Sequence, residues 1–414
     1  MRGWQIRPLA ELIENLDGKR VPVKEADRKS GPYPYYGASG IVDYVDGFLF
    51  DGLHLLVAED GDNLRTRKLP VAFLADGRFW VNNHAHVVRG NAGADTRFLC
   101  YALQQADISA FLSGSTMPKL TQGNLLRIPI LTPPLPEQRA IAATLGALDD
   151  KIELNRRMNA TLETMARALF RDWFVDFGPT RARVAGYPPT LAPDLWSLFP
   201  DRLDDDGKPE GWEEKPLTEF FSIIGGGTPK TSTTEFWDGP IPWFSVTDTP
   251  PNGSVFVTDT EKTIAEAGLN GSSARLVPKG TTIISARGTV GNLAMTGRNM
   301  TFNQSCYGLR GTGAVGDCAT YLIAQNMVSQ LQAMAHGSVF STITRQTFEA
   351  LSLPMPDARV LAAFEDAVAP LFEKILANVI ESRTFAQTRD LLLPRLMSGD
   401  LRVAEAERLA DNTI

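Results

Sequence analysis

The sequence predicts an α+β fold in which two mixed, β-rich domains alternate with two long helices, as an internal repeat. Three observations lead to this prediction: an overlong helical pattern, its return near the C-terminus, and short β-rich runs before each copy. The 414 residues, 43% of them apolar, suffice for two to four domains with cores of their own.

The first helical pattern occupies residues 133–178. Prolines from Pro133 to Pro136 mark its start, and Gly178-Pro179 is a stop signal. A helix of about 40 residues would be about 60 Å long, beyond what packing in one domain requires, so we expect a coiled-coil arm.

The helix carries a seam of mostly apolar residues at alternating spacings of three and four. Two asparagines interrupt this seam, and asparagine at such a position lowers stability but fixes register. In the alternative interpretation, the helix drifts from a strict heptad and the asparagines face water. The seam comprises Leu145, Leu148, Ile152, Asn155, Asn159, Leu162, Ala166, Leu169 and Trp173.

A comparison of the sequence with itself reveals two half-molecules. Gly114-Ser115 recurs as Gly337-Ser338, a shift of 223 residues, and Trp4 recurs as Trp212, a shift of 208 residues. The shift of 223 also superposes Thr121 on Thr344, Ala140 on Ala363, Leu148 on Leu371, Lys151-Ile152 on Lys374-Ile375, Asn155 on Asn378 and Leu169 on Leu392.

The repeat predicts six segments. In the globular parts, β-rich runs alternate with turns, and we expect short helices at 9–16 and 96–111. The linker between the halves holds too many prolines for a helix, and Trp196, Leu198 and Phe199 predict that it packs against some other part of the protein. The segments are domain 1 (1–133), spacer helix 1 (134–178), a proline-rich linker (179–211), domain 2 (212–355), spacer helix 2 (356–402) and a C-terminal tail (403–414).

The second helix repeats the seam less regularly. We expect Pro370 to kink or delay it and Pro394 to end or bend it. Because each domain precedes its helix, an antiparallel pair is the simplest closure, with the domains at opposite ends of a rod. Asn155 and Asn378 would then lie near a pseudo-two-fold axis, where their amides could pair and set the register.

Composition excludes several classes of protein. Neither a signal peptide nor a membrane-spanning apolar run is present, so we expect a cytoplasmic protein without membrane contact. Cys100, Cys306 and Cys318 have neither disulfide nor zinc spacing, and we expect them in the core. The net charge of −7 neither establishes nor excludes DNA binding, since a basic face can coexist with an acidic total.

Several stretches, in this order and spacing, resemble the DNA-specificity subunit of type I restriction-modification systems, and the resemblance covers nearly the whole chain. The stretches are YPYYGASGIVDYVDGFLFDG, VNNHAHVV, LPEQRAIAATLGALDDKIELNRR, GGGTPKTSTTEFWDGPIPWFSVTD, VPKGTTIISARGTVGNLAMT, NQSCYGL and LLLPRLMSGDLRV.

The resemblance implies two target recognition domains, each reading half of an asymmetric bipartite sequence in double-stranded DNA. It implies that the helices set the spacer and dock the modification (methyltransferase) subunits, two in number, and that restriction/translocase subunits join the complex. Catalysis, with S-adenosylmethionine, ATP and Mg, would belong to these partners, so we expect no catalytic residue, metal or cofactor in this chain.

Candidate base readers are polar loop residues, because Arg, Asn and Gln make the bidentate pairs with guanine and adenine. For any one of them, a plain surface or turn role is about as probable as a DNA contact. The candidates are Tyr35, Tyr36, Ser39, Arg65, Arg67, Lys68, Asn83 and His84 in domain 1, and Lys230, Thr231, Ser232, Arg287, Thr289 and Asn292 in domain 2.

Two motifs invite other interpretations. The run Gly225–Lys230 lacks the spacing and the following helix of a phosphate-binding loop. His84 and His86 have no third metal ligand nearby, and strand alternation would place both on one face of the sheet.

Two further functions remain open from the sequence. The chain could be a scaffold that organises proteins without reading DNA, or a DNA-modifying enzyme with an unrecognised site. Base-specific footprints would exclude the scaffold, and methylation or cleavage by the purified chain alone would support the enzyme.

Overall fold

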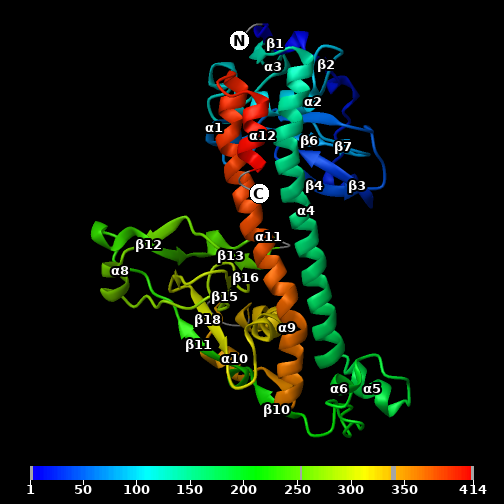
Figure 1. The fold of residues 1–414 in the computed structure, drawn as a ribbon, viewed down its shortest axis with the longest axis vertical. Coiled ribbons are helices and arrows are strands. Elements are labelled where there is room, and N and C mark those ends of the chain that lie inside the picture. Colours follow the sequence, from blue (N-terminus) through cyan, green and yellow to red (C-terminus); the bar gives the residue numbers. More distant parts are fainter. Residues whose placement is uncertain (1–2, 252–253, 337–341, 412–414) are drawn as a thin grey trace. The chain divides into compact units, whose positions relative to one another are not determined.

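The computed structural model describes residues 3–251, 254–336 and 342–411, which form two compact units. Unit 1 comprises Met1–Ile152 and Thr384–Ile414, and unit 2 comprises Glu153–Arg383. Two long helices, α4 (Leu135–Phe174) and α11 (Ala358–Ser398), contribute to both units (Figure 1).

Unit 1 contains three sheets, with strand orders β2-β8-β5-β6, β4-β3-β7 and β1-β9. The central strand β5 is buried along its whole length, and α2 covers its sheet. Its strands are β1 (Gln5–Pro8), β2 (Ile13–Asn15), β3 (Ser30–Gly37), β4 (Gly40–Val45), β5 (His54–Ala58), β6 (Ala72–Ala75), β7 (Trp80–Val81), β8 (Ala85–Gly90) and β9 (Pro129–Thr132). Its shorter helices are α1 (Asn63–Thr66), α2 (Thr96–Gln105), α3 (Gln122–Arg127) and α12 (Val403–Asp411).

Unit 2 repeats this plan, with strand orders β11-β18-β15-β16-β13, β14-β12-β17 and β10-β19, and with α9 on its largest sheet. Its strands are β10 (Glu213–Pro216), β11 (Phe221–Gly225), β12 (Trp237–Phe244), β13 (Phe256–Val257), β14 (Lys262–Ile264), β15 (Thr282–Ser285), β16 (Leu293–Thr296), β17 (Thr301–Phe302), β18 (Cys306–Gly311) and β19 (Ser352–Met355). Its shorter helices are α5 (Gly178–Val184), α6 (Pro193–Trp196), α7 (Leu217–Phe220), α8 (Glu266–Asn270), α9 (Asp317–His336) and α10 (Arg345–Glu349).

The structural repeat follows the sequence shifts closely. Adding 223 to the first residue of α3, β9 and α4 gives the first residue of α10, β19 and α11, and adding 208 to β1 gives β10. Thr121 and Thr344, matched by the same shift, both accept a hydrogen bond from the backbone of the short helix they cap. The repeat predicted from sequence is therefore confirmed at the level of single elements.

The long helices pair in an antiparallel manner within each unit, as predicted. In unit 1, Arg389 Nη1 donates to Asp149 Oδ1 at 2.7 Å, and Arg402, which follows the end of α11, donates to Glu137 near the start of α4 at 3.2 Å. In unit 2, the ring of Phe174 lies 4.8 Å from that of Phe364. Later residues of one helix thus meet earlier residues of the other.

The predicted seam faces the protein interior along its whole length. Asn155 and Asn159 are each only 5% exposed, so the alternative in which they face water is wrong. Leu145 and Leu148 contribute to the core of unit 1, and Ala166 and Trp173 to the core of unit 2.

Both prolines of α11 lie inside a continuous helix. The prediction that Pro370 delays the helix and that Pro394 ends it is wrong, because α11 begins at Ala358 and ends at Ser398. Each proline removes one backbone donor, but the buried neighbours Val368 and Leu396 hold the helix against the core.

Two local predictions also fail. Residues 9–16 form a 3-10 turn (Leu9–Glu11) and strand β2 instead of a helix, because Leu9, Leu12 and Ile13 all enter the core. The prediction that the linker holds too many prolines for a helix is wrong, because it contains α5 and α6, and both have proline in their first turn, where proline suits a helix. Phe199 of the linker is buried in the core of unit 2, as predicted.

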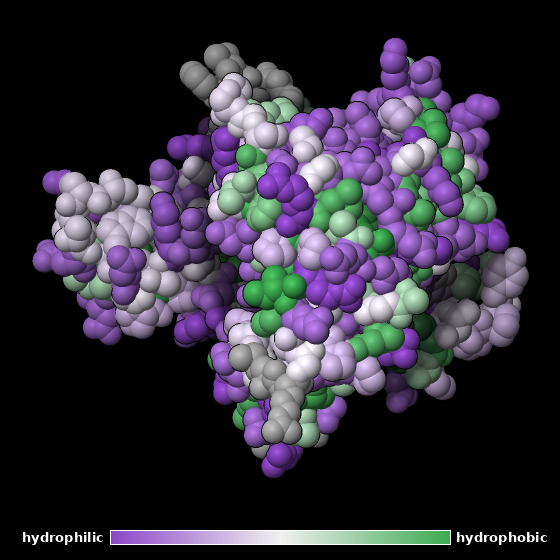
Figure 2. All heavy atoms as spheres, turned by 90° about the horizontal axis from the view of Figure 1, so that it is seen from above, coloured by the Kyte–Doolittle hydropathy of each residue, from purple (hydrophilic) through white to green (hydrophobic). Residues whose placement is uncertain are grey.

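No helix within the described ranges is long and apolar enough to cross a membrane. On the face drawn in Figure 2, hydrophilic residues cover most of the surface and hydrophobic residues form small separate groups.

Candidate nucleic-acid interface

In each unit, a short turn joins the three-stranded sheet to the largest sheet. This turn lies between β7 and β8 in unit 1 and between β17 and β18 in unit 2. The turns consist of residues 82–84 and 303–305. In each, the first residue is an asparagine whose side-chain oxygen accepts the backbone N–H two residues on, from His84 at 2.8 Å and from Ser305 at 3.0 Å. The local chemistry of both turns is therefore the same.

Matching backbone hydrogen bonds hold the two turns in the same arrangement, which we call the backbone frame. Asn82 N donates to Tyr36 O at 3.0 Å, and Asn303 N donates to Phe244 O at 2.9 Å. At the other end of each turn, a second pair of bonds closes the frame. Glu59 N donates to His84 O at 2.9 Å and Ala286 N donates to Ser305 O at 2.8 Å.

A third segment in each unit pairs with the residue that bonds the end of the turn, Glu59 or Ala286. Leu120 N donates to Glu59 O at 2.8 Å, and Ile343 N donates to Ala286 O at 3.0 Å. We call residues 59–68, 82–84 and 113–120 loop edge 1, and residues 286–292, 303–305 and 342–343 loop edge 2. Most of the candidate residues predicted from sequence lie on these two edges.

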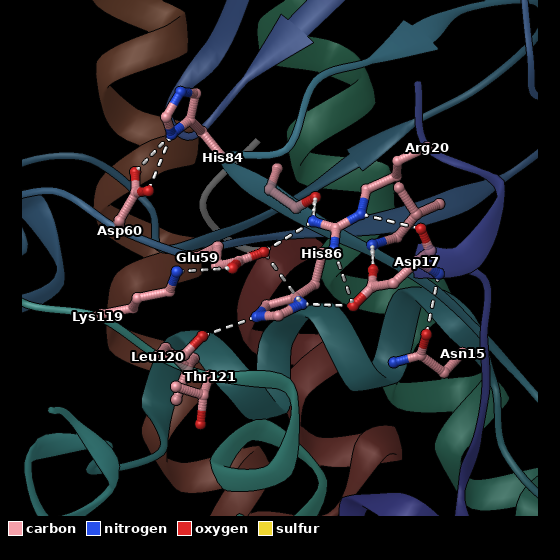
Figure 3. A network of polar contacts seen from close by, with 12 residues as sticks. Asn15, Asp17, Arg20, Glu59, Asp60, His84, His86, Lys119, Leu120 and Thr121 are labelled. Atoms are coloured by element: carbon pink, nitrogen blue, oxygen red, sulfur yellow. Dashed lines mark hydrogen bonds and ion pairs between the residues drawn. The ribbon is translucent and has the colours of Figure 1, made fainter. Parts of the chain in front are cut away.

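A buried polar network in unit 1 contacts residues of loop edge 1 (Figure 3). His86 is 1% exposed, and its ring nitrogens lie 2.6 Å from Asp17 Oδ2 and 2.7 Å from Leu120 O. Both partners are oxygen atoms, so both ring nitrogens of His86 are engaged inside the domain. Arg20 Nη1 completes the network with a 2.8 Å bond to Glu59 Oε2.

The network shifts the titration of its carboxylates. Burial alone would raise the pKa of Asp17, but the hydrogen bond and charge of His86, with Val87 N–H and Arg20, lower this pKa below its ordinary value. Burial alone would also raise the pKa of Glu59, but Arg20, His86 and Lys119 together lower this pKa below its ordinary value. Both groups are therefore held as carboxylates.

The structure corrects the prediction for Tyr35. Its side chain is fully buried, and its hydroxyl lies between Val23 N and Val23 O at 3.0 and 3.3 Å. A buried ring cannot contact a base edge, so Tyr35 supports the domain instead. Tyr36 is half-buried against Phe79, and Ser39 is exposed in the two-residue turn between β3 and β4.

The remaining candidates of domain 1 are exposed on loop edge 1. Arg65 donates to Gly114 O at 2.9 Å and Arg67 to Ala106 O at 2.5 Å, so both guanidinium groups bind backbone carbonyls instead of carboxylates. Their positive charge is therefore not neutralised by these bonds. Lys68 and Asn83 are also exposed, and His84 lies 2.9 Å from Asp60 Oδ2.

The two histidines do not share a face of the sheet, contrary to prediction. His84 is exposed just before β8, whereas His86 is buried within β8. His84 belongs to the turn that begins at Asn82, where side chains do not alternate as they do in a strand, so its side chain does not follow the direction of His86 in β8. No group of three His, Cys, Asp or Glu able to hold a metal is found in the described part of the chain.

In domain 2, Lys230, Thr231 and Ser232 are exposed on a segment that leads away from the glycine run. A side-chain carbon at Gly226 would lie 2.0 Å from Asn303 O, so this glycine allows close packing against the turn. Thr228 Oγ1 donates to Gln304 Oε1, which brings this segment to loop edge 2.

Arg287 and Thr289 are exposed on loop edge 2, and Asn292 is half-buried. Ser285 lies beneath them: its hydroxyl donates to Thr289 O and accepts from Asn292 N at 2.8 Å. Asn292 also lines a cavity of about 600 Å³ with Glu163, Tyr321, Pro250 and Ser254.

Sequence reasoning missed three residues on the loop edges: Lys119, Gln304 and Ser305. The similarity of VNNHAHVV to FNQSCYGL was the available signal, since both carry an asparagine at the same position of a strand-turn-strand unit. Lys119 is exposed and pairs with Glu59 at 3.3 Å.

The asparagines of the helix seam form a buried polar cluster in unit 2. Asn378 is fully buried, and its Nδ2 donates to Asn159 Oδ1 at 2.8 Å. Asn155 reaches the backbone oxygen of Asn378 at 3.5 Å and bonds Glu381 at 2.7 Å and Ser382 at 3.2 Å. The amide that pairs with Asn378 is thus that of Asn159, and not that of Asn155 as predicted.

Comparison with known proteins identifies the family. The model of the type I restriction modification DNA specificity domain matches residues 1–164 and again residues 209–364. The type I restriction enzyme HindI specificity subunit of Haemophilus influenzae is 29% identical over 331 residues, which cover 69% of this chain and 72% of that protein. The MjaIX specificity subunit of Methanocaldococcus jannaschii is 23% identical over 437 residues, covering 98% and 95% of the two chains.

A solved structure agrees in fold. The crystal structure of a type I restriction-modification S subunit from M. genitalium superposes with a TM-score of 0.60 at 17% identity, over 95% of this chain and 96% of that chain. The two matches to the family model together cover well over half of the sequence and coincide with the two repeats. The chain therefore belongs to the type I restriction modification DNA specificity family, and it carries the specificity domain twice.

Proposed function

We propose that this chain selects the DNA sequence on which a type I restriction-modification complex acts. Each loop edge reads one half of a bipartite target in double-stranded DNA. The observation that carries the proposal is the repeated loop edge, in which the same backbone frame presents different polar side chains. Two frames with different side chains suit the reading of two different half-sites.

The exposed cations of the loop edges are assigned to the phosphate backbone. Arg65, Arg67 and Lys68 serve loop edge 1, and Arg287 serves loop edge 2, with Lys230 on the adjoining segment. Such contacts position a protein on DNA without reading sequence, so their loss weakens binding to all sequences and reduces its salt dependence.

The long helices are assigned the role of a spacer. An antiparallel pair of about 60 Å corresponds to roughly one and a half to two turns of B-DNA, which sets the gap between half-sites. The buried amides of Asn155, Asn159 and Asn378 would fix the register of this pair. Among the six segments expected from the sequence, we assign the reading of the half-sites to the two domains and the spacing to the two helices.

As a specificity subunit, the chain is non-catalytic, and the chemistry belongs to partner subunits. We propose two modification subunits that supply S-adenosylmethionine and a restriction subunit that uses ATP and Mg. We propose the cytoplasm as the place of action.

The decisive experiment is methylation mapping in cells that carry this chain with its modification subunits. We expect one bipartite motif, and replacing residues 1–133 by those of a relative should change only one half of it. A change in both halves would contradict the assignment of one domain to one half-site.

The spacer role has its own test. Inserting one heptad into α4 should lengthen the gap and leave both half-sites intact. An unchanged gap would show that the helices do not set the distance.

A further inference from the structure

We infer that Asn83 and Gln304 are specificity-determining residues, and that each reads an adenine in the half-site of its own domain. This inference rests on the proposed function, and it assigns the same task to the same position of both turns. Only Asn83 was a candidate from the sequence; Gln304 emerges from the structure.

The frame of the turns is the first argument. Asn83 and Gln304 are the middle residues of turns that share three backbone or side-chain-to-backbone hydrogen bonds. The flanking Asn82 and Asn303 use their side-chain oxygens inside the turn. The middle side chains are exposed, so each frame holds an amide outward at a fixed place.

The chemistry of the amide is the second argument. A carboxamide offers a donor and an acceptor side by side, the pattern that adenine N7 and N6 complement in the major groove. Asn83 makes no hydrogen bond to another residue of the described chain, and the Gln304 oxygen that accepts from Thr228 retains a second lone pair. In both residues, the amide NH₂ is available to a ligand.

The neighbours on the turns are less suited to this task. His84 is engaged by Asp60 at 2.9 Å, and Ser305 is half-buried. Arg65 and Arg67 each donate to a backbone carbonyl, and their exposed positive charges suit phosphate. The amide is thus the group of each turn that combines exposure with a two-point pattern.

The test uses the full chain in complex with its modification subunits. Methylation is mapped in cells for the wild type, Asn83→Ala and Gln304→Ala, and affinity is measured on the mapped duplex. Each variant should relax one A·T position in one half-site and lower affinity about tenfold, while the other half-site stays intact. Matched controls are Gln105→Ala on α2 and Asn270→Ala on α8, both exposed amides outside the loop edges, which should change neither the motif nor the affinity.

Charged variants of the same shape sharpen the test and keep it decisive if an alanine variant fails to fold. Asn83→Asp and Gln304→Glu lose the donor and retain the acceptor, which suits cytosine N4. Each should shift the preference at its one position from adenine toward cytosine. An unchanged motif in these variants overturns the inference, whereas the absence of any bipartite motif in the wild type overturns the proposed function itself.

Discussion

Loop edge 1 rests on buried ion pairs, whereas loop edge 2 rests on buried hydroxyl groups. In unit 1, Asp17 and Glu59 form ion pairs with Arg20, and His86 joins the same network through its contact with Asp17. At the position of unit 2 that corresponds to the end of β5, Ser285 makes the local bonds with a neutral side chain that is 1% exposed.

This difference shows that the same backbone frame can be stabilised by ion pairs in one unit and by hydrogen bonds of a neutral hydroxyl in the other. A buried charge depends on its partner, because losing the partner leaves an uncompensated charge in the interior. A buried hydroxyl has a smaller cost of desolvation, so its loss is tolerated better. Unit 1 should therefore respond more strongly than unit 2 to changes beneath its loop edge.

The largest expected effect tests this contrast directly. His86→Ala should lower the free energy of unfolding of unit 1 by about 3–5 kcal/mol, because Asp17 stays buried without its main partner. The matched variant Ser285→Ala should cost about 1 kcal/mol in unit 2. Hydrogen exchange followed by mass spectrometry separates the units, and equal losses would refute the contrast.

A second prediction concerns the helix seam, which is polar in unit 2. Asn378→Leu should destabilise unit 2 by about 1–3 kcal/mol, because Asn159 loses its buried donor. Changing Asn155, Asn159 and Asn378 together to Leu should recover most of this loss, since no amide is then left unpaired. Urea unfolding measures both, and a single variant more stable than the wild type would contradict the prediction.

The crossing of the long helices in unit 1 offers a smaller effect. Tyr101 Oη donates to Asp149 Oδ2 at 2.5 Å, and Arg389 Nη1 donates to Asp149 Oδ1 at 2.7 Å. The Arg389 side chain is 29% exposed, so Arg389→Met should cost only about 1 kcal/mol in unit 1. Arg359→Met, which removes a more exposed pair with Asp357, is the control and should leave stability unchanged in thermal unfolding.

The smallest effect is the response to acid. The pKa values of Asp17 and Glu59 lie below the ordinary range, so unit 1 loses their contribution as the pH falls below about 4 toward their folded pKa values. In unit 2, burial raises the pKa of Asp317, with Arg310 opposing and Glu365 adding to the rise, so protonation of Asp317 favours the folded unit. Arg156 and Arg157 lower the pKa of Glu153 to about 2, but this surface pairing contributes little to stability. Proteolysis at decreasing pH should therefore cut unit 1 first, and the reverse order would contradict this assignment.

The sequence was sufficient for the framework of the fold. Periodicity located α4, and the shift of 223 residues located its partner α11, because both signals are carried by regular spacing. Local propensity was less informative near Leu9, where burial of a short apolar run in the core overrides the helical pattern.

The loop edges were only partly predictable. Polar loop residues such as Arg65 and Asn83 could be selected by type, but no spacing shows that residues 113–120 lie against residues 59–61. The burial of single side chains could not be predicted either, because Tyr35 lies in a polar, glycine-rich stretch and is nevertheless fully buried. Such features depend on contacts between distant segments, which a single sequence does not specify.

The two-stranded sheets at the base of each domain have a further consequence. Gln5 of β1 pairs with Thr132 of β9, and Glu213 of β10 pairs with Met355 of β19, so each domain begins and ends at one place. A segment with adjacent ends can be replaced whole without moving the helices that follow it. Under the proposed function, recombination at these two strands would exchange a complete DNA-reading domain, so new specificities could arise without a new framework.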